Sequence, residues 1–189
     1  MKRNKTNYFL IYLILAGSVV LKIFDAFTPN VKYGKVFYRY GLFQEEKQNF
    51  QKARYFYEKA IRYNPNIADA YYHLGLIYKR NNDLEMALSN FQMATYLVNP
   101  DANSYAELGF MLRDLGQSKR SLSAFKKSMN VSPFSPESHF NLGMAFLLDN
   151  QIEDALTEVG FVDRLGEPHL AQELKMAINN RSGLSVKFK

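Results

Sequence analysis

The ten residues YYHLGLIYKR, 71–80, combine the pattern of a buried helix face with a residue that weakens helices. Tyr71, Leu74 and Tyr78 recur at the spacing of one face of a helix. Gly75 lies on that same face, although a glycine inside a helix costs about 1 kcal/mol relative to alanine. Its position therefore indicates that packing against this face requires a residue without a side chain.

The same kind of glycine returns at a fixed interval along the chain. The glycines that are spaced by 34 residues are Gly41, Gly75, Gly109 and Gly143. The small residues that stand twelve positions after them are Ala53, Ala87, Ser121 and Ala155. A period of roughly 20–50 residues is typical of stacked supersecondary units, so the chain is expected to consist of similar units in series.

Each interval contains two apolar helical stripes separated by a short polar break, such as RNND at 80–83. Two helices joined in this way form an antiparallel hairpin. We expect Gly75 to face Ala87 inside its hairpin, so that the two backbones approach closely. Gly109 should face Ser121 in the same way. Large residues, Tyr71 and Phe91 for instance, should fill the space above and below.

The register of these residues resembles that of the tetratricopeptide repeat family. In that family an aromatic residue, Leu-Gly, a further aromatic, Ala, an aromatic, Ala and Pro recur over about 34 residues. The resemblance covers roughly residues 34–168, about 70% of the chain. The last unit departs most from the pattern, with His139, Val159 and Val162 at places where the family favours aromatic or small residues.

The resemblance implies an all-α fold, a right-handed α-solenoid of about four helical hairpins with a C-terminal capping helix. The expected units are residues 34–67, 68–101, 102–135 and 136–167, followed by the capping helix at 168–180. Together they form one repeat domain at 31–180. One hydrophobic helix and a linker would precede the domain at 1–30, and a flexible basic tail would follow it at 181–189.

Helix boundaries carry recognisable capping residues. Ser135 stands before Pro136, which is the order of an N-cap followed by a first-turn proline. Asp83 and Asp149 follow the first helices of their units. We expect these two carboxylates to cap the second helices.

The N-terminal segment is apolar enough to interact with a membrane. The stretch YFLIYLILAGSVVL, 8–21, has no charge, and counting on to Phe27 gives the length of about 20 residues that a membrane span needs. We favour an uncleaved, single-pass anchor at 8–27. A signal peptide cleaved near Ala16-Gly17-Ser18 and a short helix packed on the domain are the alternatives. Lys2 and Arg3 favour a cytoplasmic N-terminus, with the repeat domain outside the cytoplasm.

Charge and motifs exclude two classes of function. Residues 1–35 carry +5, residues 36–180 carry −2 and residues 181–189 carry +3, so the body of the chain lacks the basic surface of a nucleic-acid binder. The chain has no cysteine, and none of its three histidines belongs to a known catalytic or metal-binding motif. We therefore expect no catalytic, cofactor-binding or metal-binding residues, and we do not expect the protein to be an enzyme. His139 is expected to be a packed ring with one polar contact.

The resemblance also implies a binding surface, because the first helices of successive hairpins line a concave groove that binds peptide segments. The matching places are Tyr38, Arg39, Leu42, Tyr72, Leu76, Lys79, Phe110, Arg113, Phe140 and Met144. Most of them are apolar, so an apolar or amphipathic protein segment is the expected partner. The chaperone-binding branch of the family grips a C-terminal carboxylate with a clamp of Lys, Arg and Asn. In this sequence the clamp positions hold residues such as Leu42, Leu76 and Glu107, so we do not expect a carboxylate-gripping chaperone adaptor.

The function expected from the sequence is that of a membrane-anchored scaffold or adaptor for protein partners, acting in the assembly of a membrane or envelope complex. Two alternatives remain open. One is a cleaved, soluble, exported adaptor. The other is a self-assembling structural protein, a homo-oligomer in which the first unit of one chain docks onto the groove of another.

Overall fold

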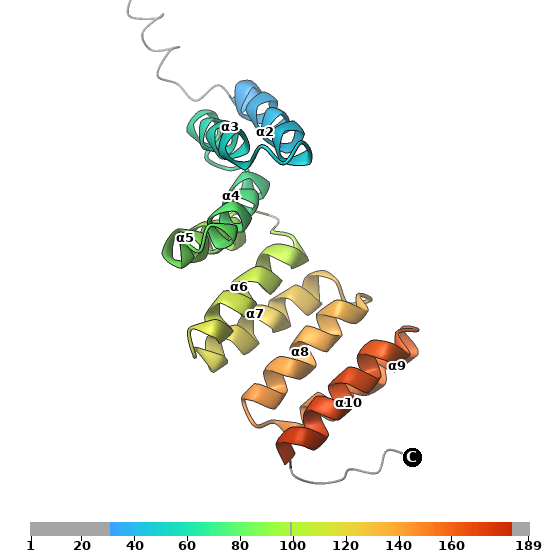
Figure 1. Cartoon of the computed structure of the whole chain (residues 1–189). Coiled ribbons are helices and arrows are strands. Elements are labelled where there is room, and N and C mark those ends of the chain that lie inside the picture. Colours follow the sequence, from blue (N-terminus) through green and yellow to red (C-terminus); the bar gives the residue numbers. More distant parts are fainter. Residues whose placement is uncertain (1–30, 99, 183–189) are drawn as a thin grey trace, which may run out of the picture. The chain divides into compact units, whose positions relative to one another are not determined.

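A computed structural model describes residues 31–98 and 100–182, and Figure 1 shows that this part of the chain is entirely helical. The helices of the described residues keep the labels of Figure 1. They are α2 (Val31–Glu46), α3 (Phe50–Tyr63), α4 (Ala68–Arg80), α5 (Leu84–Tyr96), α6 (Ala102–Asp114), α7 (Ser118–Val131), α8 (Pro136–Leu148), α9 (Ile152–Arg164) and α10 (Pro168–Ser182). The expected all-α fold is confirmed over these residues.

The chain divides into two compact units, Met1–Ala70 and Tyr71–Lys189, and the division falls inside α4. In the first unit α2 and α3 form a hairpin. In the second unit α6 pairs with α7 and α8 pairs with α9, and α10 packs on both α8 and α9. The predicted N-terminal hydrophobic helix lies outside the described residues. Among the helices that are described, none has the length and apolar character needed to cross a bilayer.

The glycines that recur every 34 residues, here called the register glycines, pack against the second helix of their hairpins. In each of the first three hairpins the neighbouring group is an aromatic ring. A Cβ atom added to Gly75 would lie 2.6 Å from the ring of Phe91, and one added to Gly109 would lie 2.8 Å from the ring of Phe125. Both rings are almost completely buried. The space above Gly75 is therefore filled by Phe91, one of the large residues expected there, and Ala87 is buried in the same cluster.

In the fourth hairpin, the space beside the register glycine is filled from another helix. Val159 stands where the other hairpins have an aromatic ring, and the atom nearest to a Cβ on Gly143 belongs to Leu174 of α10, at 2.5 Å. Leu174 is completely buried, as is Ile178 one turn later. The capping helix thus supplies the large side chain that the last hairpin lacks.

The turns inside the hairpins follow the 34-residue register too. Gln48, Asn82, Gly116 and Asn150 all have a positive φ, between 59° and 72°. Glycine and asparagine adopt this left-handed conformation at low cost, whereas most side chains resist it. The polar breaks seen in the sequence are therefore tight turns with a fixed backbone shape.

The predicted caps are correct at two of three positions. The Ser135 hydroxyl accepts a hydrogen bond from the Ser138 N–H, and the Asp83 carboxylate accepts one from the Met86 N–H. The prediction for Asp149 was wrong. Its carboxylate accepts a hydrogen bond from the Gln151 side chain, and α9 begins without a side-chain cap.

The first hairpin contains a buried phenol that makes its stability sensitive to alkaline pH. Tyr57 is completely buried and its hydroxyl donates a hydrogen bond to Glu45. Burial raises the pKa of Tyr57 well above its ordinary value of 10.0, and the hydrogen bond and the negative charge of Glu45 raise it further. The folded state therefore keeps a proton that the unfolded state loses above about pH 10.

We expect the contribution of Tyr57 to the free energy of unfolding to be constant below about pH 10 and to fall as the pH rises above it. The contribution of Tyr57 is about 1.4 kcal/mol per pH unit, because the unfolded state binds fewer protons there. Urea unfolding at a series of alkaline pH values, for the protein and for Tyr57→Phe, measures this slope. An unchanged slope in the variant would contradict the assignment.

Candidate functional site

Four of the predicted groove residues line one cavity in the second unit. Phe110 and Arg113 come from α6, and Phe140 and Met144 come from α8. The cavity has a volume of about 380 Å³ and is also lined by Leu148 and by Glu173 of α10, among others. We call this cavity, with its lining of α6, α8 and α10 residues, the α6–α8 groove.

The repeat register explains why these side chains meet. Phe110 and Met144 are 34 residues apart, and each directly follows a register glycine. Because Gly109 faces the buried Phe125 ring, the next residue points about 100° away around the helix. The Phe110 ring lies edge-on to Phe125, with centroids 5.1 Å apart, so its position is fixed by the core beneath it.

Charged groups stand beside the apolar lining of the α6–α8 groove. The Arg113 guanidinium lies 5.2 Å from the centroid of the Phe110 ring and forms an ion pair with Asp114 at 2.9 Å. Lys79 of α4 lies 5.8 Å from the same ring and pairs with Glu107 at 2.6 Å. The site therefore offers aromatic and aliphatic surface with cations at its edge whose charge is partly neutralised.

The remaining predicted groove residues have other neighbours. Tyr72 and Leu76 are half-buried against the cluster that contains Phe91, so they contribute to packing within the second unit. In the first unit the ring of Tyr38 packs against Tyr57, with centroids 5.9 Å apart.

Arg39 lines a different cavity, of about 390 Å³, together with Val36, Tyr40 and Phe43. Leu42 is half-buried on α2. Tyr38, Arg39 and Leu42, the three predicted groove residues of the first unit, therefore do not line one common cavity.

A buried polar pair in the fourth hairpin was not predicted in full. His139 Nδ1 lies 2.6 Å from Glu158 Oε2, and His139 Nε2 lies 2.9 Å from the carbonyl oxygen of Pro133. His139 and Glu158 are only 6% and 7% exposed, and the imidazole stacks on Phe161. The structure gives His139 two polar contacts, where the sequence suggested one.

The donor and acceptor roles of this pair follow from chemistry. The Pro133 carbonyl can only accept, so His139 Nε2 donates to it. One further proton is then held between Nδ1 and the Glu158 carboxyl. Among the described residues no group of three or more His, Asp or Glu lies close enough to hold a metal ion.

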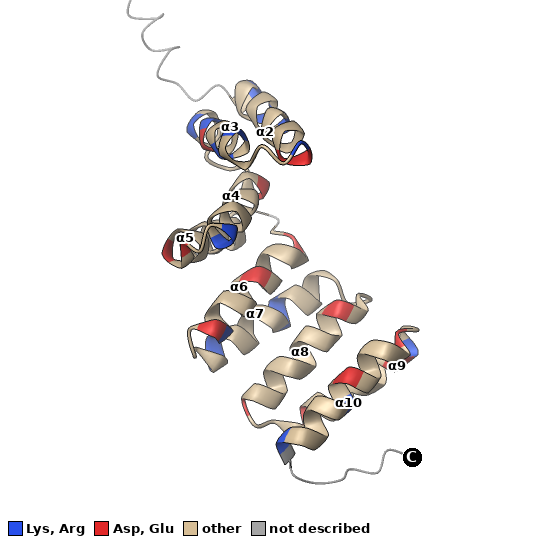
Figure 2. Cartoon of the chain, in the orientation of Figure 1, with Lys and Arg blue, Asp and Glu red and all other residues tan. Residues whose placement is uncertain are grey.

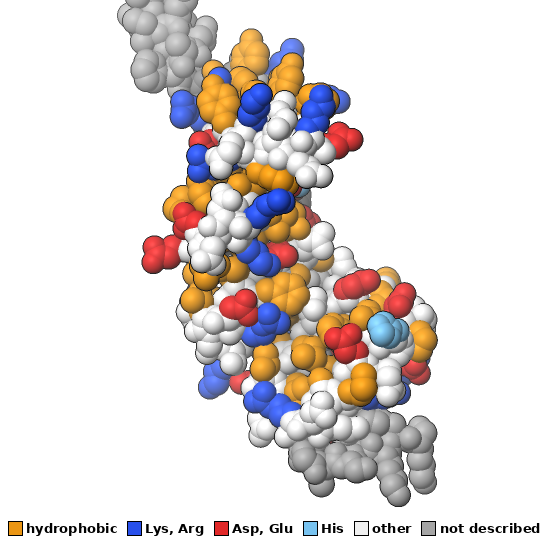
Figure 3. All heavy atoms as spheres, in the orientation of Figure 1, with side chains coloured by type: hydrophobic (Ala, Val, Ile, Leu, Met, Phe, Trp, Pro, Cys, Tyr) orange, Lys and Arg blue, Asp and Glu red, His pale blue; other side chains and the backbone are white. Residues whose placement is uncertain are grey.

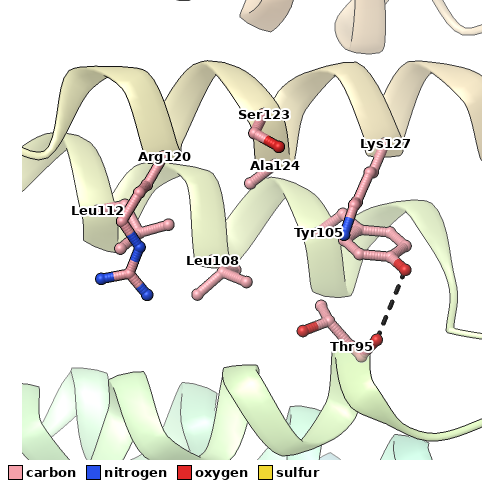
Figure 4. Close-up of a pocket in the computed structure, with 8 residues that line it drawn as sticks. All are labelled: Thr95, Tyr105, Leu108, Leu112, Arg120, Ser123, Ala124 and Lys127. Atoms are coloured by element: carbon pink, nitrogen blue, oxygen red, sulfur yellow. Dashed lines mark hydrogen bonds between the residues drawn. The ribbon is translucent and has the colours of Figure 1, made fainter.

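In the third hairpin the register positions of His139 and Glu158 hold two uncharged residues. Figure 4 shows Tyr105 and Ala124, which occupy the register positions of His139 and Glu158, in a pocket that Lys127 and Arg120 border from α7. The Tyr105 hydroxyl donates to the carbonyl oxygen of Thr95 at 3.5 Å. An aromatic ring with a neutral small residue is therefore compatible with this position of the repeat.

The comparison with protein families matches the sequence to tetratricopeptide repeat models at residues 34–67 and 56–89. Among curated proteins, the comparison finds no match.

Solved structures with a similar fold include tetratricopeptide repeat proteins. YrrB, described as a tetratricopeptide protein with an unusual peptide-binding site, is 18% identical with a TM-score of 0.63, over 79% of this chain and 86% of YrrB. The pilF protein of Pseudomonas aeruginosa is 18% identical with a TM-score of 0.65, over 80% and 70% of the two chains. A tetratricopeptide repeat protein from Parabacteroides merdae is 15% identical with a TM-score of 0.69, over 80% and 61%.

Proposed function

Because the chain carries tetratricopeptide repeats and shares the fold of tetratricopeptide proteins, which bind protein partners, we propose that it is a membrane-anchored scaffold. The scaffold binds an apolar or amphipathic segment of a partner protein in the α6–α8 groove. The observation that carries this proposal is the convergence of Phe110, Phe140 and Met144 on one cavity. Such a cavity with few polar groups at its edge suits the apolar side of a peptide.

The charges at the edge of the groove restrict the partner. Arg113 and Glu173, of opposite sign, both line the cavity, so a bound segment with one acidic and one basic residue outside its apolar anchors would be held in register. The peptide-binding site that is described for YrrB supports a peptide as the class of ligand. Tetratricopeptide proteins are generally non-enzymatic scaffolds, and the proposal assigns no catalytic role to any residue.

The anchor of the scaffold is residues 8–27, and the repeat domain faces away from the cytoplasm. The uncharged stretch 8–21 and the basic residues before it support this arrangement. A scaffold so placed would act in the assembly of a membrane or envelope complex. Intact mass of the purified protein tests whether the segment is retained, because cleavage near Ala16 would remove the residues up to that point.

The groove is tested by a charge introduced into it. In Met144→Glu we expect the yield of cross-links from the groove to a partner, measured by mass spectrometry of the full-length protein in its native membranes, to fall at least about tenfold. A carboxylate there would have to be desolvated against apolar side chains when the partner binds.

Met176→Glu is the matched control, because Met176 lies on α10, is 51% exposed and does not line the groove. Its cross-link yield should equal that of the unmodified protein. Circular dichroism should be the same for both variants. Equal cross-link yields from the two variants would refute the groove as the binding site.

A further inference from the structure

The first helix of the domain has an exposed face that is both apolar and basic. Val36, Tyr40 and Phe43 lie on one side of α2 and are 42%, 53% and 46% exposed. The opposite side of the helix carries the buried Gly34 and Gly41, which pack toward α3. We call Val36, Tyr40 and Phe43, with the exposed cations Lys32, Lys35 and Arg39 on the same helix, the α2 outer face.

The repeat register shows that this face is built for burial. Phe43 occupies the position of Met111 in α6 and of Ala145 in α8, and both of those residues are only 2% exposed. Met111 belongs to one apolar cluster with Phe91 of α5, and Ala145 belongs to one with Phe125 of α7. In later repeats this face of the first helix thus packs on the preceding hairpin. No hairpin precedes α2 among the described residues.

Charge distinguishes the α2 outer face from those later interfaces. Within residues 31–70 there are eight Lys and Arg against four Asp and Glu. Figure 2 marks Lys and Arg positions along α2 and α3, and Figure 3 shows blue basic side chains beside orange apolar ones over the same helices. Lys47 also lies 4.2 Å from the centroid of the exposed Phe43 ring. Aromatic rings interleaved with cations are typical of a helix that lies in the interface of an anionic membrane.

The position of the proposed anchor brings this face to the membrane, and this step rests on the proposed function. The anchor ends at Phe27, and only residues 28–30 separate it from Val31 at the start of α2. Even fully extended, the chain from Phe27 to Val31 spans at most about 14 Å. A membrane-embedded segment 8–27 would therefore hold the first turn of α2 close to the lipid headgroups.

From this register, charge and connection we infer that the α2 outer face lies on an anionic lipid surface. Lipid tails near the headgroups contact Val36, Tyr40 and Phe43 as a preceding hairpin does in later repeats, while Lys32 and Lys35 contact anionic headgroups. Two other occupants fit less well. Residues 1–30 carry four basic residues and one acidic residue, and a second copy packed face to face presents the same basic face, so either would add positive charge to positive charge.

The chain contains no tryptophan, so one introduced tryptophan is a specific reporter. Tyr40→Trp in the full-length protein is mixed with phosphatidylcholine vesicles with and without phosphatidylglycerol, both with brominated acyl chains. With phosphatidylglycerol present, we expect emission to shift to shorter wavelength and to be quenched at least about threefold. Tyr96→Trp is the control, since Tyr96 is 83% exposed at the end of α5 and does not belong to the α2 outer face, and it should remain unquenched.

A second variant separates adsorption from mere proximity to the anchor. Replacing Lys32, Lys35 and Arg39 by glutamine should abolish the dependence of Tyr40→Trp quenching on phosphatidylglycerol, while flotation of the protein with the vesicles is unchanged. If the protein floats but the reporter is not quenched, the inference is overturned and the anchor stands. If the protein does not float, the proposed anchor fails and the inference fails with it.

The other occupants give different results. A shift to shorter wavelength without lipid that grows with protein concentration would show a second copy on the face. The same shift at every concentration would show residues 1–30 of the same chain on it. Either result overturns the inference.

Discussion

Replacing Glu158 by alanine is expected to lower the free energy of unfolding by about 3 kcal/mol or more. The substitution leaves the buried His139 Nδ1 without the carboxylate that lies 2.6 Å away. Both side chains are almost completely buried, so water cannot easily replace the lost partner. Urea unfolding of the full-length protein, followed by circular dichroism, measures the effect.

The third hairpin provides the compensating change. In the double variant His139→Tyr/Glu158→Ala, the fourth hairpin has the same two residue types that the third hairpin has at Tyr105 and Ala124. We expect its stability to return to within about 1 kcal/mol of the original protein, because a buried polar pair can be replaced by well-packed apolar groups at little cost. A double variant that is as unstable as Glu158→Ala would show that the polar pair has no such substitute.

Replacing Gly75 by valine is expected to cost about 3 kcal/mol of stability through overpacking. The new Cβ would lie 2.6 Å from the Phe91 ring, which is completely buried and cannot move aside without displacing its neighbours. The higher helix propensity of valine compared with glycine returns only about half a kcal/mol. The same urea unfolding experiment checks this value.

Gly160→Val is the matched control in α9, because a Cβ at Gly160 meets no atom within 4 Å. The two variants introduce the same side chain into the interior of a helix, but only one of them meets a ring. We expect Gly160→Val to raise the free energy of unfolding slightly, by at most about 0.5 kcal/mol. Equal destabilisation by the two substitutions would refute the steric role of Gly75.

The spacing of a few residue types predicted the helical hairpins closely. The polar breaks at 80–83 and 113–118 contain the tight turns between α4 and α5 and between α6 and α7. The capping helix begins at Pro168 as expected and ends two residues later than predicted, at Ser182. Such features depend on neighbours within a few positions in the chain, so they can be read from the sequence.

The partners of individual side chains were harder to predict. Asp149 was expected to cap α9, and its carboxylate bonds to a neighbouring side chain instead. Glu158 was overlooked, since a single carboxylate among surface-like residues of a helix gives no sign that it faces a histidine. Its register position, which holds Asn90 and Ala124 in earlier repeats, was the available signal.

The candidate binding site shows the same division. The register identified Phe110, Arg113, Phe140 and Met144 as residues on one side of successive first helices, and these four do line one cavity. The sequence did not separate them from Tyr72 and Leu76, which occupy equivalent positions but pack on the cluster around Phe91.

By itself, the sequence determined the repeat, its period, the positions of the turns and the face that each helix buries. These follow from local preferences and from the periodicity of apolar residues. Only the tertiary structure decided which side chain fills the space at Gly143, where Glu158 finds its partner, and which groove residues remain accessible. The reason is that such contacts join residues on different helices, and their geometry depends on how the helices pack rather than on the order of the residues.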